Sequence, residues 1–174
     1  MTVNGMVASK PATGVTTDVA IVVRDDDSAP DYVSRGGHKL AGALKAFQPH
    51  GLEVSGLRCL DAGASTGGVT DVLLRHGARE VLAVDVGYGQ LAWSLRSDER
   101  VVVHDRTNIR DLTLAVVGEP VDLVVGDLSF ISLGLVLDPL LSVASPDAQL
   151  ALMVKPQFEV GKDRVGRGGV VRDL

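Results

Sequence analysis

The chain has 174 residues, of which 45% are hydrophobic and 3% aromatic, and its formal net charge is −5. This length allows one well-packed domain with a smaller appendage. The acidic balance excludes a global basic field, so any affinity for RNA must come from a local patch. The single cysteine, Cys59, excludes a disulfide scaffold and is typical of a cytoplasmic protein. No apolar run is long enough to cross a bilayer.

Residues 1–24 predict two short β segments around a turn-rich middle. Thr2 and Val3 lead into Asn4-Gly5, a strong hairpin signal, and a second strand is expected over Val19–Val23. So few residues cannot bury a core, so we expect them to be the end of a small domain whose beginning is absent. Residues 25–32, which carry three consecutive aspartates and a proline, predict a linker before a domain over 33–174.

A helix is predicted to open between Ser34 and Gly37. Apolar residues then recur at helical spacing on one face: Leu40, Ala43, Leu44 and Phe47. Lys39 lies beside this stripe, near the helix N-terminus, where the helix dipole disfavours a cation. Lys39 is therefore either an ordinary solvated lysine or a residue kept there for function.

The stretch from Leu57 to Val69, L-R-C-L-D-A-G-A-S-T-G-G-V, predicts a strand, a glycine-rich loop and a helix N-terminus. This is the layout of a nucleotide-type cofactor site. A dinucleotide fold requires G-x-G-x-x-G, but Ser65 takes the place of the second glycine, and Asp61 would repel a pyrophosphate. S-adenosylmethionine carries an ammonium and a sulfonium, which an acidic strand end tolerates, while its carboxylate suits free N–H groups. We therefore expect S-adenosylmethionine here, with ordinary strand-end residues as the alternative.

From Leu57 onward, apolar strands alternate with helical or loop segments. The predicted strands are Arg58–Asp61, Glu80–Asp85, Val101–His104, Val121–Asp127 and Gln149–Val154. The predicted helical or loop segments are Thr70–His76, Gln90–Arg96, Thr107–Val117 and Ser132–Ser145. Continuous apolar strands indicate a parallel sheet covered on both faces, whose ligands bind at the carboxyl ends of the strands. Four strand ends carry reactive groups at that edge: Asp61, Asp85, Asp127 and Lys155.

Asp127 and Lys155 follow neighbouring strands, which predicts a carboxylate and an amine beside the cofactor. Methyl transfer to a hydroxyl requires removal of the hydroxyl proton, and a lysine accepts that proton only when its amine is neutral. Lys39 is a candidate second cation that also holds a nucleic-acid substrate. The alternative is an Asp–Lys pair that simply closes the sheet edge. The four histidines have no metal-ligand spacing, so no metal site is expected.

The segment after Lys155 is basic and rich in glycine. Its cations are Lys162, Arg164, Arg167 and Arg172. Such a loop suits contacts to a phosphate backbone, and Arg35 could extend the patch on the other side of the cleft. A solvated charged loop is the alternative.

Several motifs together resemble the TlyA family, the hemolysin-named bacterial rRNA ribose methyltransferases related to FtsJ-type enzymes. They are V-S-R-G-G-H-K-L, L-D-A-G-A-S-T-G-G, V-D-V-G-Y-G-Q-L-A-W-S-L-R, D-L-S-F-I-S-L and V-K-P-Q-F-E-V-G-K, within Val33 to Val171. The resemblance implies a Rossmann-like class I methyltransferase with an open parallel sheet, which transfers a methyl group from S-adenosylmethionine to a ribose 2′-hydroxyl of ribosomal RNA. The opening V-N-G and K-P-A-T-G-V look like the end of an S4-type RNA-binding domain.

The resemblance also implies site residues. The family uses a Lys-Asp-Lys-Glu tetrad, whose first three members correspond to Lys39, Asp127 and Lys155. Cofactor contacts are expected at Asp61, Gly63, Ala64, Ser65, Thr66, Gly67, Gly68, Val69, Asp85, Asp105, Arg106, Thr107 and Asn108. RNA contacts are expected at Arg35, Lys162, Arg164 and Arg167.

Two departures from the family pattern shape the expectation. The S4-type helices are missing, and the chain stops at Leu174, before the last family strands and the tetrad glutamate. We therefore expect a fragment in which the strand before Lys155 forms an exposed sheet edge. The alternatives are a non-catalytic fragment that binds cofactor or RNA and, with less support, a membrane-lytic hemolysin. The sequence does not identify the target nucleotide or the oligomeric state.

Overall fold

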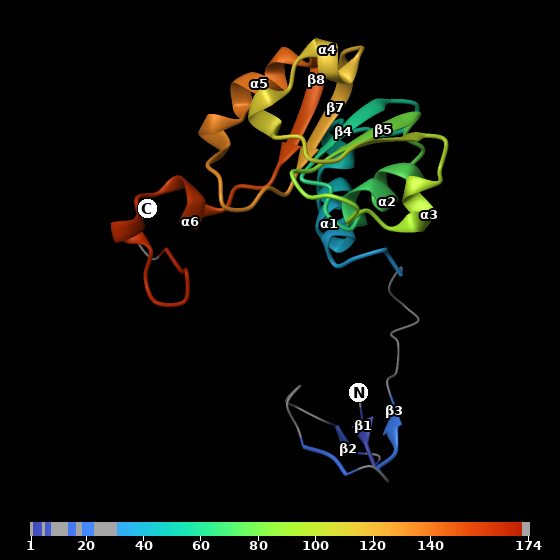
Figure 1. The fold of residues 1–174 in the computed structure, drawn as a ribbon, viewed down its shortest axis with the longest axis vertical. Coiled ribbons are helices and arrows are strands. Elements are labelled where there is room, and N and C mark those ends of the chain that lie inside the picture. Colours follow the sequence, from blue (N-terminus) through green and yellow to red (C-terminus); the bar gives the residue numbers. More distant parts are fainter. Residues whose placement is uncertain (1, 5, 8–13, 17–18, 23–30, 172–174) are drawn as a thin grey trace. The chain divides into compact units, whose positions relative to one another are not determined.

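The computed structural model describes residues 2–4, 6–7, 14–16, 19–22 and 31–171. The chain divides into two units, Met1–Asp31 and Tyr32–Leu174 (Figure 1). The division falls close to the predicted start of the methyltransferase domain at residue 33. The assignment of the first unit to an S4-type domain stays a prediction.

The first unit contains a small antiparallel sheet with the order β2-β1-β3. Its strands are β1 (Thr2–Val3), β2 (Met6–Val7) and β3 (Ile21–Val22). Asn4, at φ +47°, lies between β1 and β2, in agreement with the predicted hairpin turn. Its side-chain carbonyl accepts the N–H of Ala20 at 3.2 Å, and its own N–H donates to the Ala20 carbonyl at 2.9 Å, which joins the hairpin to the approach to β3.

The second unit is built on a five-stranded parallel sheet with the order β6-β5-β4-β7-β8. The strands are β4 (Arg58–Ala62), β5 (Glu80–Val84), β6 (Val101–His104), β7 (Val121–Gly126) and β8 (Ala144–Leu152). Strand order reverses between β4 and β7, so this is the switch point at which an open α/β sheet binds ligands. The parallel sheet predicted from the sequence is confirmed.

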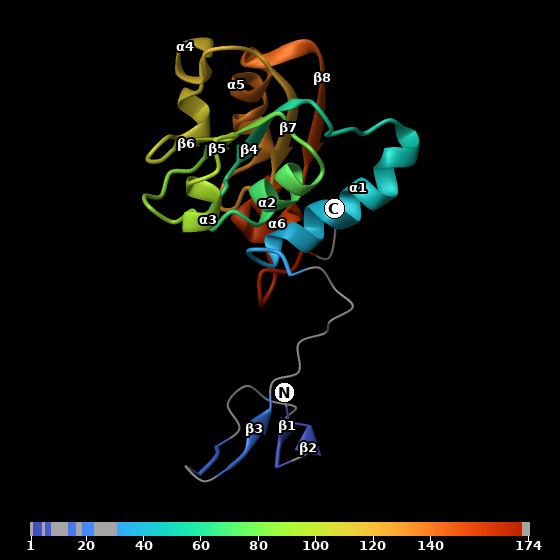
Figure 2. The same ribbon diagram turned by 90° about the vertical axis from the view of Figure 1, so that its right-hand side faces the viewer.

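Helices cover both faces of this sheet (Figures 1 and 2). One face carries α1 (Gly36–Phe47), α2 (Gly68–Arg75) and α3 (Trp93–Arg96), and the other carries α4 (Leu114–Val117) and α5 (Leu137–Ser142). Strand residues alternate between two buried clusters. Val81 and Ala83 pack with the first set of helices, whereas Leu82 and Val84 pack with the second. Burial on both faces explains why the strands are apolar throughout.

The predicted helical or loop segments are helical only in part. Gln90–Arg96 is helical only in α3, and Ser132–Ser145 contains a short 3₁₀ helix, η3 (Leu133–Leu135), followed by α5. The predicted start of the last strand was wrong. β8 begins at Ala144 rather than Gln149. Pro146 and Asp147 are typical of a turn, but here they lie in an edge strand whose pairing with β7 shifts register between Val121 and Leu123. An edge strand with such an irregularity tolerates a proline.

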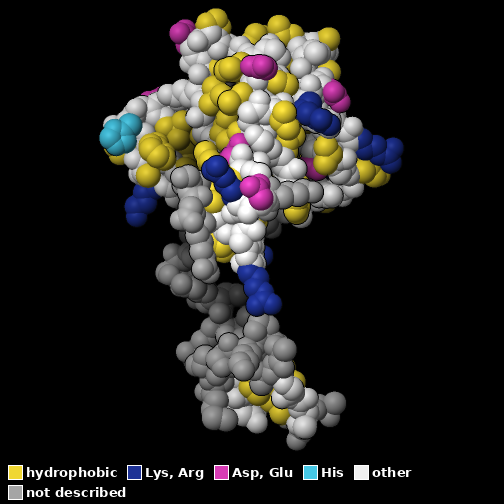
Figure 3. Space-filling model, turned by 90° about the vertical axis from the view of Figure 1, so that its left-hand side faces the viewer, with side chains coloured by type: hydrophobic (Ala, Val, Ile, Leu, Met, Phe, Trp, Pro, Cys, Tyr) yellow, Lys and Arg dark blue, Asp and Glu magenta, His cyan; other side chains and the backbone are white. Residues whose placement is uncertain are grey.

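β8 lies at the edge of the sheet, as expected. The Gln149 side chain accepts the N–H of Glu53 at 3.1 Å and donates to the Gly51 carbonyl at 2.7 Å, so it ties this edge to the segment after α1. A groove of about 500 Å³ runs between α1 and β8, with Leu40, Ala43, Leu150 and Leu152 in its walls. Hydrophobic side chains gather on the face of the unit shown in Figure 3.

Arg58 begins β4 and is buried at the amino ends of the strands, with 6% of its surface exposed. Its guanidinium pairs with Glu80 and donates to the carbonyls of Glu119 and Val117, the last at 2.8 Å. Its backbone N–H donates to Asp122 at 2.9 Å. Because each guanidinium nitrogen has an acceptor, the burial of this cation is compensated.

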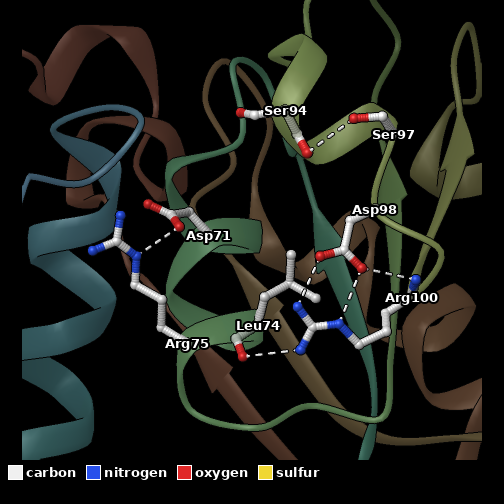
Figure 4. Close-up of polar contacts among 7 residues, drawn as sticks. All are labelled: Asp71, Leu74, Arg75, Ser94, Ser97, Asp98 and Arg100. Carbon is white, nitrogen blue, oxygen red and sulfur yellow. Dashed lines mark hydrogen bonds and ion pairs between the residues drawn. The ribbon is translucent and has the colours of Figure 1, made fainter.

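Two hydrogen bonds, each made by a residue that also takes part in an ion pair, fix α2, the helix that follows the glycine-rich loop (Figure 4). Asp71 pairs with Arg75 at 2.7 Å and also accepts the N–H of Val33 at 3.0 Å. Near the C-terminal end of α2, Arg100 pairs with Asp98 at 2.7 Å and donates to the Leu74 carbonyl at 3.4 Å. These contacts fix α2 against the start of α1 and the approach to β6. Among the described residues, no helix has the length and apolarity of a membrane span.

Candidate active site

Lys39, Asp127 and Lys155 meet at the carboxyl edge of the sheet. Asp127 Oδ2 lies 2.6 Å from the Lys39 Nζ, and Oδ1 lies 2.7 Å from the Lys155 Nζ. Lys155 also donates to the Ser129 hydroxyl at 2.7 Å and to the Asp127 carbonyl at 3.3 Å. The structure thus brings together the three residues that the sequence predicts as the catalytic group. Their chemical roles stay predictions.

The three residues come from separate elements that the fold makes neighbours. Asp127 directly follows β7, and Lys155 precedes α6 (Pro156–Glu159) after β8. Because β7 and β8 are parallel neighbours, their carboxyl ends adjoin. Lys39 arrives from α1, which buries Leu40 and Leu44 in the core and leaves the Lys39 side chain 47% exposed. The predicted mismatch between this cation and the helix dipole is offset by its pairing with Asp127.

Two cations determine the charge of Asp127. Burial alone would raise the pKa of this carboxyl, but hydrogen bonds and charge from Lys155 and Lys39 outweigh burial and hold the pKa below its usual value. Asp127 is therefore an anion at neutral pH. It orients both amines.

A hollow of about 710 Å³ opens above this cluster. Its walls contain the three cluster residues, parts of the glycine-rich loop and the start of α1: Ser34, Arg35, Gly36, Lys39, Gly63, Ala64, Ser65, Gly68, Val69, Asp127, Ser129 and Lys155. A second hollow of about 290 Å³ shares Gly63, Ser65, Asp127 and Ser129 and reaches Asp85, Gln90 and Ile109. The shared lining residues place the two hollows beside each other along the strand ends.

The glycine-rich loop turns tightly between β4 and α2. Gly63, Ser65 and Gly67 have φ values of +87°, +49° and +102°. Asp85 accepts the N–H groups of Ser65 at 2.8 Å and Gly87 at 2.7 Å, so it braces this loop from the end of β5. Thr66 is exposed and lines neither hollow.

Packing within the protein accounts for two of the glycines. A Cβ at Gly67 would lie 2.2 Å from the Leu95 side chain, and a Cβ at Gly68 would lie 2.3 Å from the Ser34 hydroxyl. Glycines in a cofactor loop are expected to permit positive φ angles and close approach of a ligand. The positive φ of Gly67 agrees with this expectation. At both positions, however, neighbouring side chains of the protein itself also leave no room for a Cβ.

Asp61 lines neither hollow. It is 1% exposed, and its carboxylate accepts the Thr70 hydroxyl at 2.6 Å through Oδ2. The other oxygen, Oδ1, is buried without a hydrogen-bond partner among the described residues. Burial raises the pKa of Asp61 to about 7 despite the bonds from Thr70, and the charges of Asp85 and Asp127 raise it further. Asp61 lies beneath the loop rather than on the wall, and its contact with a cofactor stays a prediction.

The predicted segment Asp105–Asn108 lies next to Asp85 but lines neither hollow. Asp105 pairs with Arg96 at 2.7 Å, which lowers the pKa of its carboxyl. Arg106, at φ +54°, stacks over the Tyr88 ring at 4.3 Å. Thr107 donates its N–H to the Asp85 carbonyl at 2.9 Å, and Asn108 caps the 3₁₀ helix η2 (Ile109–Asp111). The next residue, Ile109, does reach the smaller hollow.

The predicted RNA-contacting residues fall in two places. Arg35 lines the larger hollow. Lys162 and Arg164 lie in the 3₁₀ helix η4 (Lys162–Arg164), and Arg167 follows it. Arg164 and Arg167 are exposed. The structure does not bring this loop into either hollow.

The prediction missed Ser34, Gln90 and Ser129, which line the hollows. Ser129 was identifiable in principle, because it lies two residues after Asp127 in the quoted motif D-L-S-F. Ser34 and Gln90 had no comparable signal, since one precedes a helix and the other follows a glycine-rich turn. Among the described residues, no group of three metal-binding side chains occurs.

The fold and this cluster define a class of protein. Residues 32–174 match the model of the FtsJ-like methyltransferase family, so the chain belongs to that family. It is 60% identical over 172 residues to the 16S/23S rRNA (cytidine-2′-O)-methyltransferase TlyA of Mycobacterium tuberculosis. That alignment covers 98% of this chain and 62% of the relative. It is also 38% identical over 143 residues to the 23S rRNA (cytidine-2′-O)-methyltransferase TlyA of Campylobacter jejuni, of which it covers 53%.

Two solved structures share the fold of this chain. A hemolysin-named protein from Lactococcus lactis matches with a TM-score of 0.76 and 50% identity, over 82% of this chain and 67% of that one. A methyltransferase from Listeria monocytogenes, described as S-adenosylmethionine dependent, matches with a TM-score of 0.54 and 19% identity, over 76% of this chain and 65% of that one. This last similarity concerns the fold alone. The resemblance inferred from the motifs is confirmed.

Proposed function

We propose that this chain carries the methyltransferase centre of an enzyme that methylates a ribose 2′-hydroxyl of ribosomal RNA, using S-adenosylmethionine. The observation that carries the proposal is the Lys39–Asp127–Lys155 cluster on the wall of a hollow that also includes the glycine-rich loop. The 60% identity to a TlyA rRNA methyltransferase supports the choice of substrate. Such a substrate places the reaction in the cytoplasm.

The residues around the hollows suit S-adenosylmethionine. Asp85 lies beside Ser65 on the wall of the smaller hollow, where a carboxylate suits ribose hydroxyls. Oδ1 of Asp61, buried beneath the loop and without a hydrogen-bond partner among the described residues, is available to a donor from the cofactor. When bound, the cofactor supplies an electrophilic methyl group. The backbone of residues 63–69 would hold it.

Lys155 is proposed to take the proton from the ribose hydroxyl. Its Nζ faces the larger hollow and is positioned by Asp127 and Ser129, so a neutral amine at this atom would meet an incoming hydroxyl. Lys39 lies on the opposite oxygen of Asp127. Its charge would attract the RNA phosphates. Arg35, in the same wall, would contact the backbone of the RNA.

The test measures cofactor binding and methyl transfer separately in the full-length natural protein. Calorimetry with S-adenosylmethionine gives the first, and tritium transfer to ribosomal subunits, mapped to a 2′-O-methyl group, gives the second. Lys155→Ala is expected to lower methyl transfer by about 100-fold or more while cofactor affinity stays within about threefold. Lys45→Ala, an exposed lysine at the last turn of α1, is the matched control.

Each result discriminates between the functions considered. Binding of S-adenosylmethionine without any transfer to ribosomal RNA would favour the non-catalytic fragment. Unchanged transfer by Lys155→Ala would overturn the assigned base. The hemolysin alternative rests on the names of relatives.

A further inference from the structure

The loops that follow β7 and β8 touch one another at several successive points. Lys155 contacts Asp127 and Ser129, as described above. One step further out, the Phe130 and Phe158 rings meet with centroids 5.3 Å apart and planes tilted by 46°. These two phenylalanines stand three residues after Asp127 and Lys155, respectively. The contacts therefore run in parallel along both loops, away from the cluster.

Glu159, one residue after Phe158, also joins the two loops. Its Oε2 accepts the Ser132 hydroxyl at 2.6 Å, and its Oε1 accepts the Leu133 N–H at 2.8 Å. Ser132 in turn accepts the Gly134 N–H at 3.1 Å, so both residues satisfy N–H groups at the start of η3. A charged acceptor makes such bonds stronger than neutral ones. One carboxylate thus fastens the end of α6 to the beginning of η3.

The place of Glu159 in α6 links it to Lys155. α6 is a single turn that begins directly after Lys155 and ends at Glu159. The Phe158 N–H donates to the Lys155 carbonyl at 2.8 Å, and the Val160 N–H donates to the Pro156 carbonyl at 3.1 Å. This short helix has few bonds of its own, so an anchor at its last residue limits the movement of its first. Glu159 lines neither hollow, which excludes direct contact with a substrate there.

The loop that receives this anchor is itself under strain. Phe130 has φ +64°, an uncommon conformation for a bulky residue, and 91% of its surface is exposed. Such a conformation persists only where surrounding contacts fix it. The hydrogen bonds that Ser132 and Leu133 donate to Glu159 supply a fixed point two and three residues after it.

We propose that Glu159 is a positioning residue that clamps the two loops together and so holds the Lys155 amine against the Asp127 carboxylate. This inference rests on the proposed function for its kinetic test, but the clamp also has a readout that does not depend on activity. Its loss would leave Lys155 free to sample other positions. A displacement of about 1 Å at a catalytic group costs on the order of 100-fold in rate.

The kinetic test compares Glu159→Ala, Glu159→Gln and the control Glu99→Ala in the full-length protein. Glu99 is an exposed carboxylate just before β6, at the opposite edge of the sheet. Glu159→Ala is expected to lower kcat by about 10-fold to 100-fold, with the KM for RNA and the Kd for S-adenosylmethionine within about threefold. Glu159→Gln keeps an acceptor for Leu133 and a donor for the Ser132 oxygen, so it should restore most of kcat. Ser132→Ala combined with Glu159→Ala should cost little more than Glu159→Ala alone.

The second readout is the pKa of Asp127, followed by carboxyl carbon NMR. Because Lys155 helps to hold this pKa down, Glu159→Ala should raise it towards the ordinary value of about 3.9, whereas Glu159→Gln and Glu99→Ala should not. An unchanged Asp127 pKa in folded Glu159→Ala overturns the positioning role. Wild-type kcat in that variant also overturns it, as does an equal loss in Glu159→Gln. If the wild-type protein transfers no methyl group, the proposed function fails, and the NMR result alone decides the clamp.

Discussion

The two ends of the parallel sheet both gather charged side chains, but they use them differently. At the amino ends, Arg58 is buried and every acceptor around it comes from the protein: Glu80, Val117 and Glu119. At the carboxyl ends, Lys39, Asp127 and Lys155 pair with one another on the wall of an open hollow. A charged cluster alone therefore says little about function. An open hollow beside the charged cluster is what distinguishes a catalytic candidate from a structural ion pair.

The difference predicts that the amino-end cluster governs stability alone. Arg58→Met leaves the Glu80 carboxylate and two carbonyls without their cation, so the free energy of unfolding should fall by about 3–5 kcal/mol. Urea denaturation measures this loss, and the folded variant should keep a specific activity within about twofold of wild type. The matched control is Arg79→Met, whose pair with Asp122 is longer, 3.6 Å, and more exposed. It should cost less than about 1 kcal/mol. A stable but inactive Arg58→Met variant would contradict the claim that the amino-end cluster governs stability alone.

The carboxyl-end cluster should show the reverse behaviour. Asp127→Asn removes the charge between two lysines while keeping the shape of the side chain, so methyl transfer should fall by about 100-fold to 1,000-fold. Both ion pairs are partly exposed, so the free energy of unfolding should change by no more than about 1 kcal/mol. Asp138→Asn, on the exposed side of α5, serves as control. Equal losses of activity in the two variants would contradict the assigned role.

Asp61 extends the comparison, because its side chain is buried although it lies at the carboxyl ends of the strands. With its pKa raised to about 7 in the folded state, the native protein binds more protons than the unfolded chain between about pH 4 and 7. Stability should therefore fall as pH rises through this window, by about 2–4 kcal/mol in total. Asp61→Asn should remove that slope, as measured by unfolding at a series of pH values. Identical slopes in the two proteins would exclude the raised pKa.

The smallest expected effect belongs to Lys39, the more exposed of the two amines. Lys39→Met should lower methyl transfer by about 10-fold, since Asp127 retains Lys155 as a partner. The same change should raise the pKa of Asp127, because one of the charges that lower it is gone. Carboxyl carbon NMR and the transfer assay test the two expectations together. If Lys39→Met transferred methyl groups at the wild-type rate and left the pKa of Asp127 unchanged, Lys39 would be an ordinary surface lysine with no role in the reaction.

Much of this arrangement followed from the sequence by one topological rule. Parallel strands end at the same edge, so Asp127 and Lys155 could be placed side by side from their positions after two apolar runs. The bounds of β8 could not be predicted from the sequence. Ser145, Pro146 and Asp147 favour a turn, and only pairing with β7 overrides that local preference. The depth of Asp61 and the clamp by Glu159 also depend on tertiary packing. No local pattern distinguishes them from ordinary acidic residues.

The glycines that follow β4 have a consequence for reading family alignments. An alanine at residue 67 would collide with Leu95, and one at residue 68 would collide with Ser34, whether or not any ligand is present. Selection against larger residues at these two sites would thus act on the apo protein during folding. Invariance at these two positions in an alignment would therefore report intramolecular crowding as much as recognition of a methyl donor.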